Sequence, residues 1–209
     1  MEFQMRNKTL TSSMVGALLF GGTLGGASAA QAATVIDNFA TGFGGAFTIT
    51  TQSGAGILGT RQVSNGSGML LSSANPGMNW NGNAYNYSEV NYSNFGSLDF
   101  TNVALTMTGS GSATGTAKLL VTIGDGNGNE GFWNVAFGSS ITMSTSIFGA
   151  TSGLNLADIR SIRLQTGDTG SGDTVNYTMT NFSYSAVPAP GALALLGVAG
   201  LAGGRRRRA

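Results

Sequence analysis

Short runs of alternating apolar and polar residues recur along the middle of the chain. Val103, Leu105 and Met107 alternate with smaller or polar residues, and residues 117–123 repeat the pattern. A period of two residues is typical of a strand with one buried face. Similar runs, each bounded by Gly, Asn, Ser or Asp, predict further strands at residues 34–39, 46–51, 57–63, 67–74, 84–92, 131–137, 140–143, 159–166 and 174–185.

The last of these runs changes phase along its length. Alternation through Val175, Tyr177 and Met179 shifts to Phe182 and Tyr184, which predicts a β-bulge between the two halves. No window keeps a helical period beyond one turn, and the best candidate for a turn is 154–158. The pattern therefore predicts an all-β fold, a β-sandwich or jelly roll of about ten short antiparallel strands.

Three segments resemble the galactose-binding-like jelly rolls of exported bacterial proteins. They are "VIDNF" near the start of the domain, "NLADIRSIRL" late in it, and a final "YTMTNFSYS". The resemblance implies that the last strand lies beside the first. It bears on the fold and not on an activity.

The composition narrows the function further. Residues 33–187 hold four basic and eight acidic residues, a formal charge of −4, although the whole chain carries +1. Nucleic acid is therefore not an expected partner, because phosphate binding needs clustered Lys and Arg. The chain has no Cys and no His, which excludes disulfides, thiolate nucleophiles, imidazole bases and the usual zinc and haem sites.

The N-terminus has the three parts of a secretory signal peptide. Arg6 and Lys8 precede a short apolar run at 14–24, and Ala30 and Ala32 form an A-x-A cleavage pattern. We therefore expect residues 1–32 to be removed on export. The remaining chain up to residue 186 is predicted to form one domain.

The C-terminal residues 187–209 combine prolines, a short apolar segment and an arginine cluster. Residues 191–204 would span about 21 Å as a helix, less than the hydrocarbon core of about 30 Å. Pro188 and Pro190 separate this apolar helix from the last strand. The arginines would stay on the cytoplasmic side of a membrane; they are Arg205, Arg206, Arg207 and Arg208.

This tail closely resembles the PEP-CTERM sorting signal of Gram-negative bacteria. The match rests on Val187, Pro188, Pro190 and Gly191, whereas Ala189 stands where the family usually has glutamate. The resemblance implies that an exosortase removes the tail after transient membrane insertion. The protein would then reach the cell surface or the extracellular matrix. A simple C-terminal membrane anchor is the alternative.

One acidic loop suggests a structural calcium ion, the one cofactor that the sequence brings into consideration. Asp125, Asn127 and Asn129 alternate, and Glu130 adds a carboxylate. The spacing does not match an EF-hand, which needs glycine at its sixth position. A hairpin turn between two strands is the alternative interpretation, since Asp-Gly and Asn-Gly are typical turn residues.

Aromatic residues among asparagines suggest sugar recognition at 75–96. The candidates for carbohydrate binding are Trp80, Tyr85 and Tyr87, because rings stack on sugar C–H faces while amides bond to hydroxyls. The alternative is that these aromatics are ordinary strand formers. Trp133 alternates with Val135 and Phe137 and is expected in the core.

No pair of carboxylates has a spacing that singles it out as a glycosidase site, and no phosphate-binding loop occurs. We therefore predict no catalytic residues. The expected function is binding or packing with extracellular polysaccharide. The alternatives are a structural or adhesive matrix component without a defined ligand and, less favoured, a polysaccharide hydrolase.

Overall fold

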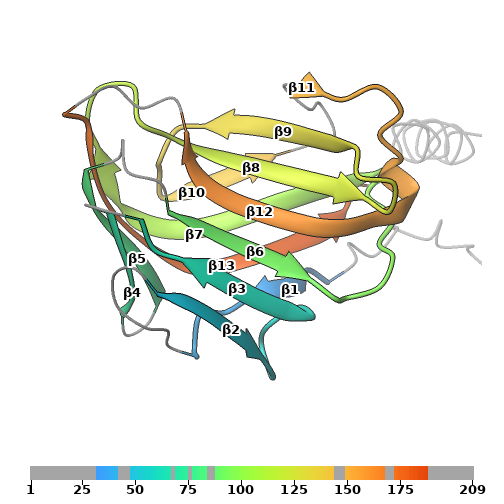
Figure 1. Cartoon of the computed structure of the whole chain (residues 1–209), viewed down its shortest axis with the longest axis horizontal. Coiled ribbons are helices and arrows are strands. Elements are labelled where there is room, and N and C mark those ends of the chain that lie inside the picture. The colour runs from blue at the N-terminus through green and yellow to red at the C-terminus, as the bar shows by residue number, and fades with distance from the viewer. Residues whose placement is uncertain are drawn as a thin grey trace, which may run out of the picture.

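The protein folds as two antiparallel β-sheets packed face to face (Figure 1). The computed structural model describes residues 32–41, 48–66, 69–74, 77–83, 88–143, 149–167 and 172–187. Within these ranges the chain forms thirteen strands and one short 3₁₀ helix. The predicted all-β sandwich is confirmed, with more strands than the ten expected.

The first sheet has six strands. Its order is β10 (Ser140–Met143), β7 (Val103–Ala113), β13 (Thr174–Ala186), β5 (Gly77–Asn83) and β4 (Met69–Ala74), and β1 (Thr34–Asp37) also pairs with β13. One side of β13 pairs with β7 along most of its length. The other side pairs first with β5 and then with β1. The expectation that the last strand lies beside the first is thus confirmed.

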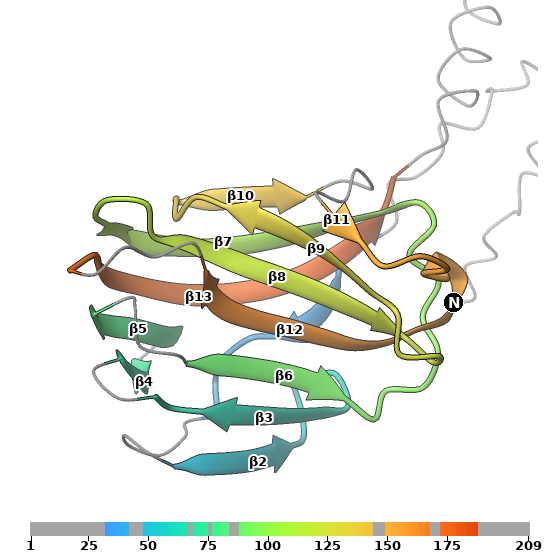
Figure 2. The same cartoon turned by 45° about the horizontal axis from the view of Figure 1, so that its top comes forward.

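The second sheet has seven strands and faces the viewer in Figure 2. Its order is β11 (Gly149–Ala150), β9 (Glu130–Val135), β8 (Lys118–Asp125), β12 (Ile159–Gly167), β6 (Glu89–Ser93), β3 (Thr60–Ser64) and β2 (Ile49–Ser53). The 3₁₀ helix η1 (Leu156–Asp158) lies just before β12, within the segment where a helical turn is predicted. Asn155 caps it by accepting a hydrogen bond from the N–H of Ala157.

The core lies between the sheets and is built from the inward positions of both. On β8, the inward residues Leu119, Val121 and Ile123 are at most 1% exposed. Aromatic rings join the layers: Tyr92 on β6 and Phe182 on β13 have their ring centroids 6.0 Å apart. Trp133 is 8% exposed and belongs to this core, as the alternation predicts.

The predicted bulge in β13 is present. The register against β7 shifts between Met179 and Asn181, which lets Tyr177 and Met179 before the shift, and Phe182 after it, all face inward. The strand β5 is a correction, because residues 77–83 lay in no predicted strand. Asparagine and glycine are rare in strands and masked the alternation of Met78 and Trp80.

Candidate functional site

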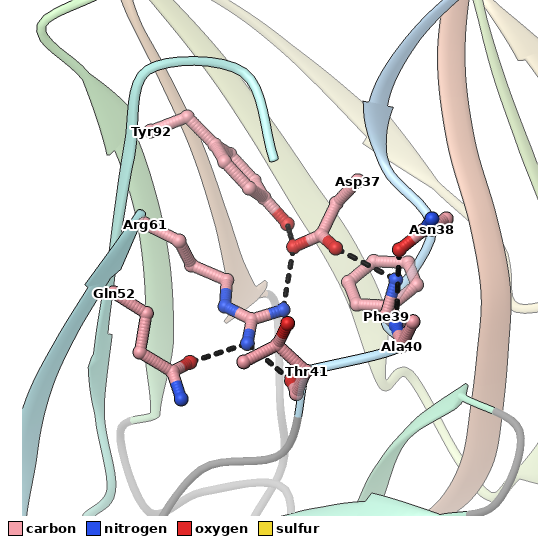
Figure 3. A network of polar contacts seen from close by, with 8 residues as sticks. All are labelled: Asp37, Asn38, Phe39, Ala40, Thr41, Gln52, Arg61 and Tyr92. Carbon is pink, nitrogen blue, oxygen red and sulfur yellow. Dashed lines mark hydrogen bonds and ion pairs between the residues drawn. The ribbon is translucent and has the colours of Figure 1, made fainter. Parts of the chain in front are cut away.

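Polar residues meet in the interior near the β2 edge of the seven-stranded sheet (Figure 3). Gln52, Arg61 and Tyr92 are cross-strand neighbours on β2, β3 and β6. Asp37 reaches them from β1 of the other sheet: its Oδ2 is 2.7 Å from Arg61 Nη1 and accepts a 3.0 Å hydrogen bond from the Tyr92 hydroxyl. Arg61 also donates to the side chain of Gln52 and to the carbonyl of Thr41.

This network is closed to ligands. The side chains of Asp37 and Arg61 are 0% exposed. Burial raises the pKa of Asp37 above its ordinary value, and the positive charge of Arg61 offsets part of the rise. Burial and the nearby Asp37 carboxylate also raise the pKa of Tyr92 well above 10. The network therefore joins the two sheets and offers no surface to a partner.

The acidic loop chosen as a calcium site is a β8–β9 hairpin turn whose carboxylate is already saturated. Asp125 Oδ1 accepts from the backbone N–H groups of Asn127 and Asn129, at 2.8 and 2.9 Å. Its Oδ2 accepts from the Asn129 amide and from the backbone of Asn155, both at 3.0 Å. Four donors occupy the four lone-pair positions of the carboxylate, so none points toward a cation.

The hydrogen bonds explain the acidity of Asp125. The Asn129 amide and the backbone donors lower its pKa to about 2. The described residues also contain no group of three or more acidic side chains that could hold a metal ion. The structure supports the hairpin interpretation, and the calcium ligands proposed for Asp125, Asn127, Asn129 and Glu130 are not assembled in it.

Glu130 instead takes part in a charged cluster on the outer face of the seven-stranded sheet. Arg163 on β12 lies between two carboxylates: Nη2 is 3.2 Å from Glu130 Oε2 on β9, and Nε is 3.8 Å from Glu89 Oε2 on β6. We call these three residues the Arg163 triad. The side chains of Glu130 and Arg163 are 46% and 33% exposed, so the triad is accessible to a ligand.

Arg163 lies in a row of outward residues that crosses the whole sheet. The strand registers place them as successive cross-strand neighbours: Thr51, Gln62, Asn91, Arg163, Thr122, Phe132 and Gly149. Amide, guanidinium and hydroxyl groups thus follow one another at the inter-strand spacing of about 4.8 Å. We call this arrangement the outer row.

An aromatic ring closes one end of the outer row. Phe132 is partly exposed and faces outward, because its neighbour Trp133 faces the core. A Cβ added at Gly149 would lie 2.5 Å from the Phe132 ring, so the ring rests against the β11 backbone. Sequence analysis missed Phe132, although the core position predicted for Trp133 implied that the preceding residue faces solvent.

The aromatic residues chosen for sugar binding do not form this site. Trp80 is 0% exposed and packs in the core, so it cannot stack on a ligand, and that prediction is wrong. Trp80 is buried because its side chain faces inward on β5, where the residue pairs with the buried Tyr177 of β13. Tyr85 and Tyr87 lie outside the described residues.

The outer face of the six-stranded sheet has a different character. Most of its described outward positions on the three strands β5, β7 and β13 carry small uncharged polar residues, and none of them carries a ring; among them are Asn79, Asn81, Ser110, Ser112, Asn176 and Thr178. Some of these side chains bond to one another, as Asn79 does to Thr178 at 2.9 Å. The ring and the charged groups are therefore a feature of the other face.

The predicted processing signals lie mainly beyond the described ranges. Ala30, Pro188, Ala189, Pro190, Gly191 and the four arginines fall outside them, whereas Ala32 and Val187 are described and exposed. Within the described part of the chain, no helix has the length and apolar character needed to cross a membrane.

No family model and no curated protein sequence matches the chain. Among solved structures it is similar to the family 11 carbohydrate-binding module of a cellulosomal cellulase of Clostridium thermocellum. The two sequences are 15% identical, the match covers 75% of this chain and 95% of that chain, and the TM-score is 0.44. A family 29 carbohydrate-binding module variant complexed with mannohexaose matches with 15% identity over 68% of this chain and 93% of that one, at a TM-score of 0.38.

An exo-β-agarase also matches, with 12% identity, 71% of this chain covered and a TM-score of 0.41. The chain spans 24% of the length of that enzyme. At these identities and scores, the likenesses carry no information about ligand or activity.

Proposed function

We propose that the domain binds extracellular polysaccharide on the outer row and does not change it chemically. The observation that carries this proposal is the alignment of Gln62, Asn91 and Arg163 on adjacent strands. Phe132 lies two strands beyond Arg163, across Thr122, which is 4% exposed. Amide and guanidinium groups exchange hydrogen bonds with sugar hydroxyls, and a partly exposed ring supports the apolar face of a sugar.

The outer row favours a polysaccharide ligand that lies perpendicular to the strands. Each step along the outer row is about 4.8 Å, which is close to the length of one sugar ring, so consecutive sugars would meet consecutive strands. Gln62, Asn91, Arg163 and Phe132 lie on strands that are paired on both sides within the seven-stranded sheet, and this backbone pairing holds the side chains in place without a ligand. Such preorganisation reduces the entropy lost on binding.

Affinity electrophoresis in gels that contain soluble polysaccharides tests the proposal. We expect at least one polymer to retard the wild-type protein, and Phe132→Ala to weaken that binding by about fivefold, since packing of a sugar on an aromatic ring contributes on the order of 1 kcal/mol. Asn81→Ala, an exposed residue on the outer face of the other sheet, is the matched control and should bind as the wild type does. Thermal unfolding of each variant separates lost binding from lost folding.

The alternatives give different results in the same experiment. A folded wild-type protein that no polysaccharide retards would favour the structural or adhesive matrix component. Shortening of a polymer, abolished by Glu89→Gln or Glu130→Gln, would favour a hydrolase. Shortening of a polymer is not expected, because Arg163 lies between the two carboxylates as an ion-pair partner of each.

For the destination of the protein, we propose export followed by exosortase processing of the tail at 187–209 in a Gram-negative bacterium. The support is the order of signal peptide, proline motif, apolar segment and arginine cluster in the sequence. Mass spectrometry of the secreted protein should find a C-terminus between residues 187 and 191. Recovery of surface protein that still carries Arg205 to Arg208 would contradict processing and favour the simple anchor.

A further inference from the structure

We infer that Glu89 and Glu130 are specificity residues that restrict the outer row to neutral polysaccharide by masking the charge of Arg163. The inference rests on the proposed binding function and names the class of ligand. It begins from an asymmetry in the Arg163 triad, which holds one positive and two negative charges and therefore carries −1 at neutral pH.

The two carboxylates come from strands on opposite sides of Arg163. Glu89 belongs to β6, which pairs directly with β12, whereas Glu130 belongs to β9, which is separated from β12 by β8. Glu130 must therefore reach past one strand to come within 3.2 Å of Arg163 Nη2. The guanidinium therefore has a carboxylate on each side of β12, and each carboxylate lies two residues along its strand from a member of the outer row.

The Arg163 guanidinium forms ion pairs with two carboxylates, but not all of its N–H groups form hydrogen bonds. Its Nε is buried and has no hydrogen-bond acceptor within the described ranges, because Glu89 Oε2 lies 3.8 Å away, beyond hydrogen-bond distance. A lone arginine at the centre of a polar sheet would attract carboxylate and sulfate groups, which it binds with two parallel hydrogen bonds. The flanking Glu89 and Glu130 form ion pairs with the guanidinium, and their negative charges repel the carboxylate and sulfate groups of a ligand.

The other charged residues near the outer face do not offset the net negative charge of the Arg163 triad. Lys118 lies at the start of β8, paired with Gly167, beyond the outward position of Leu120. Asp158 and Arg160, at the other end of β12, neutralise each other at 2.6 Å. A uronic acid polymer therefore meets net negative charge at the triad, whereas the hydroxyls of a neutral polymer can still bond to the carboxylate oxygens and to Gln62 and Asn91.

Replacing both glutamates gives a gain-of-function test. Glu89→Gln/Glu130→Gln keeps the shape of the side chains and changes the triad from −1 to +1. We expect the double variant to bind polygalacturonate at least about tenfold more tightly than the wild type at low ionic strength, with the gain lost at high salt. The wild type should bind a neutral glucan, galactan, mannan or xylan and not polygalacturonate.

The matched control is Asp99→Asn/Asp173→Asn. It raises the net charge by the same two units at positions in connections that precede β7 and β13, away from the triad. This control should show no comparable gain. A gain in both double variants would assign the effect to net charge and overturn the inference. If the double variant does not fold, as judged by thermal unfolding, Glu130→Gln alone tests the same point, because Glu130 is half-exposed.

The outcomes distinguish the two proposals. A wild type that binds no polysaccharide, neutral or acidic, contradicts the proposed function and the inference with it. A wild type that binds neutral polymer, with no gain for polygalacturonate in the glutamate variants, overturns the inference alone. Strong binding of polygalacturonate by the wild type also overturns the inference and leaves the proposed function intact.

Discussion

Single carboxylates have opposite roles in this molecule according to the donors around them. Asp125 accepts hydrogen bonds from its own loop and from Asn155, which favour its charged form. Asp37 is enclosed between the sheets, where Arg61 and Tyr92 are its partners. The sequence alone suggested a cation for the first and nothing for the second. Part of the Asp125 arrangement could not be predicted, because Asn155 approaches from a segment 30 residues away, a contact that no local pattern contains.

The Asp125 hydrogen bonds predict a loss of stability in acid. The pKa of Asp125 is about 2 in the folded protein and 3.8 ordinarily, so the unfolded chain binds more protons between these values. The contribution of Asp125 to the free energy of unfolding is therefore complete above about pH 4 and is lost as the pH falls toward 2. Urea unfolding of wild type and Asp125→Asn at pH 2, 3, 4 and 6 measures this, and the difference between the two proteins should shrink in acid. A difference that is constant with pH would contradict the prediction.

Strands were predictable where apolar residues alternate over several positions without glycine or asparagine, as at residues 103–107 of β7, 119–123 of β8 and 159–166 of β12. β5 was missed because its outward positions carry the asparagines that normally mark turns. The Arg163 triad could not be predicted at all. Glu89, Glu130 and Arg163 meet only through the order of β9, β8, β12 and β6, and strand order depends on long-range pairing.

The pairing of β7 with β13 makes Gly111 a sensitive position. Its φ is +127°, and an added Cβ would lie 2.1 Å from the carbonyl oxygen of Asn176 on the neighbouring strand. We expect Gly111→Ala to lower the free energy of unfolding by about 2 kcal/mol or more, because backbone strain and the clash act together. Gly138→Ala is the control, since nothing lies within 4 Å of its added Cβ. Chemical denaturation compares them, and equal effects would contradict this account of β7.

At the scale of the whole molecule, the Asp37–Arg61 pair connects the two sheets near the edge where β2 and β3 lie. Arg61→Met would leave the Asp37 carboxylate buried without its ion-pair partner, and we expect a loss of about 3–5 kcal/mol in the free energy of unfolding. Adding Asp37→Asn should recover part of this loss, because the uncompensated charge is removed. Urea unfolding of the single and double variants measures the recovery.

Asp158→Asn provides the comparison for that experiment. It breaks the Asp158–Arg160 pair, in which the arginine side chain is 52% exposed, and solvent screening should make its effect far smaller. If the two residues act independently, the double variant should be less stable than Arg61→Met, and the further loss should equal the effect of Asp37→Asn alone. That result would contradict the role given to the pair.

The position of β13 also has a mechanical consequence. Its last residue, Ala186, pairs with Val103 at the start of β7, and the backbone N–H of Val187 donates to the carbonyl of Asn102, so the pairing extends to the last described residue. A pull on the tail along β13 would load the ladders to β7 and β5 in shear, because antiparallel hydrogen bonds run perpendicular to the strands. Many bonds would then have to break together, and single-molecule stretching from the C-terminus should find high resistance, not stepwise unzipping.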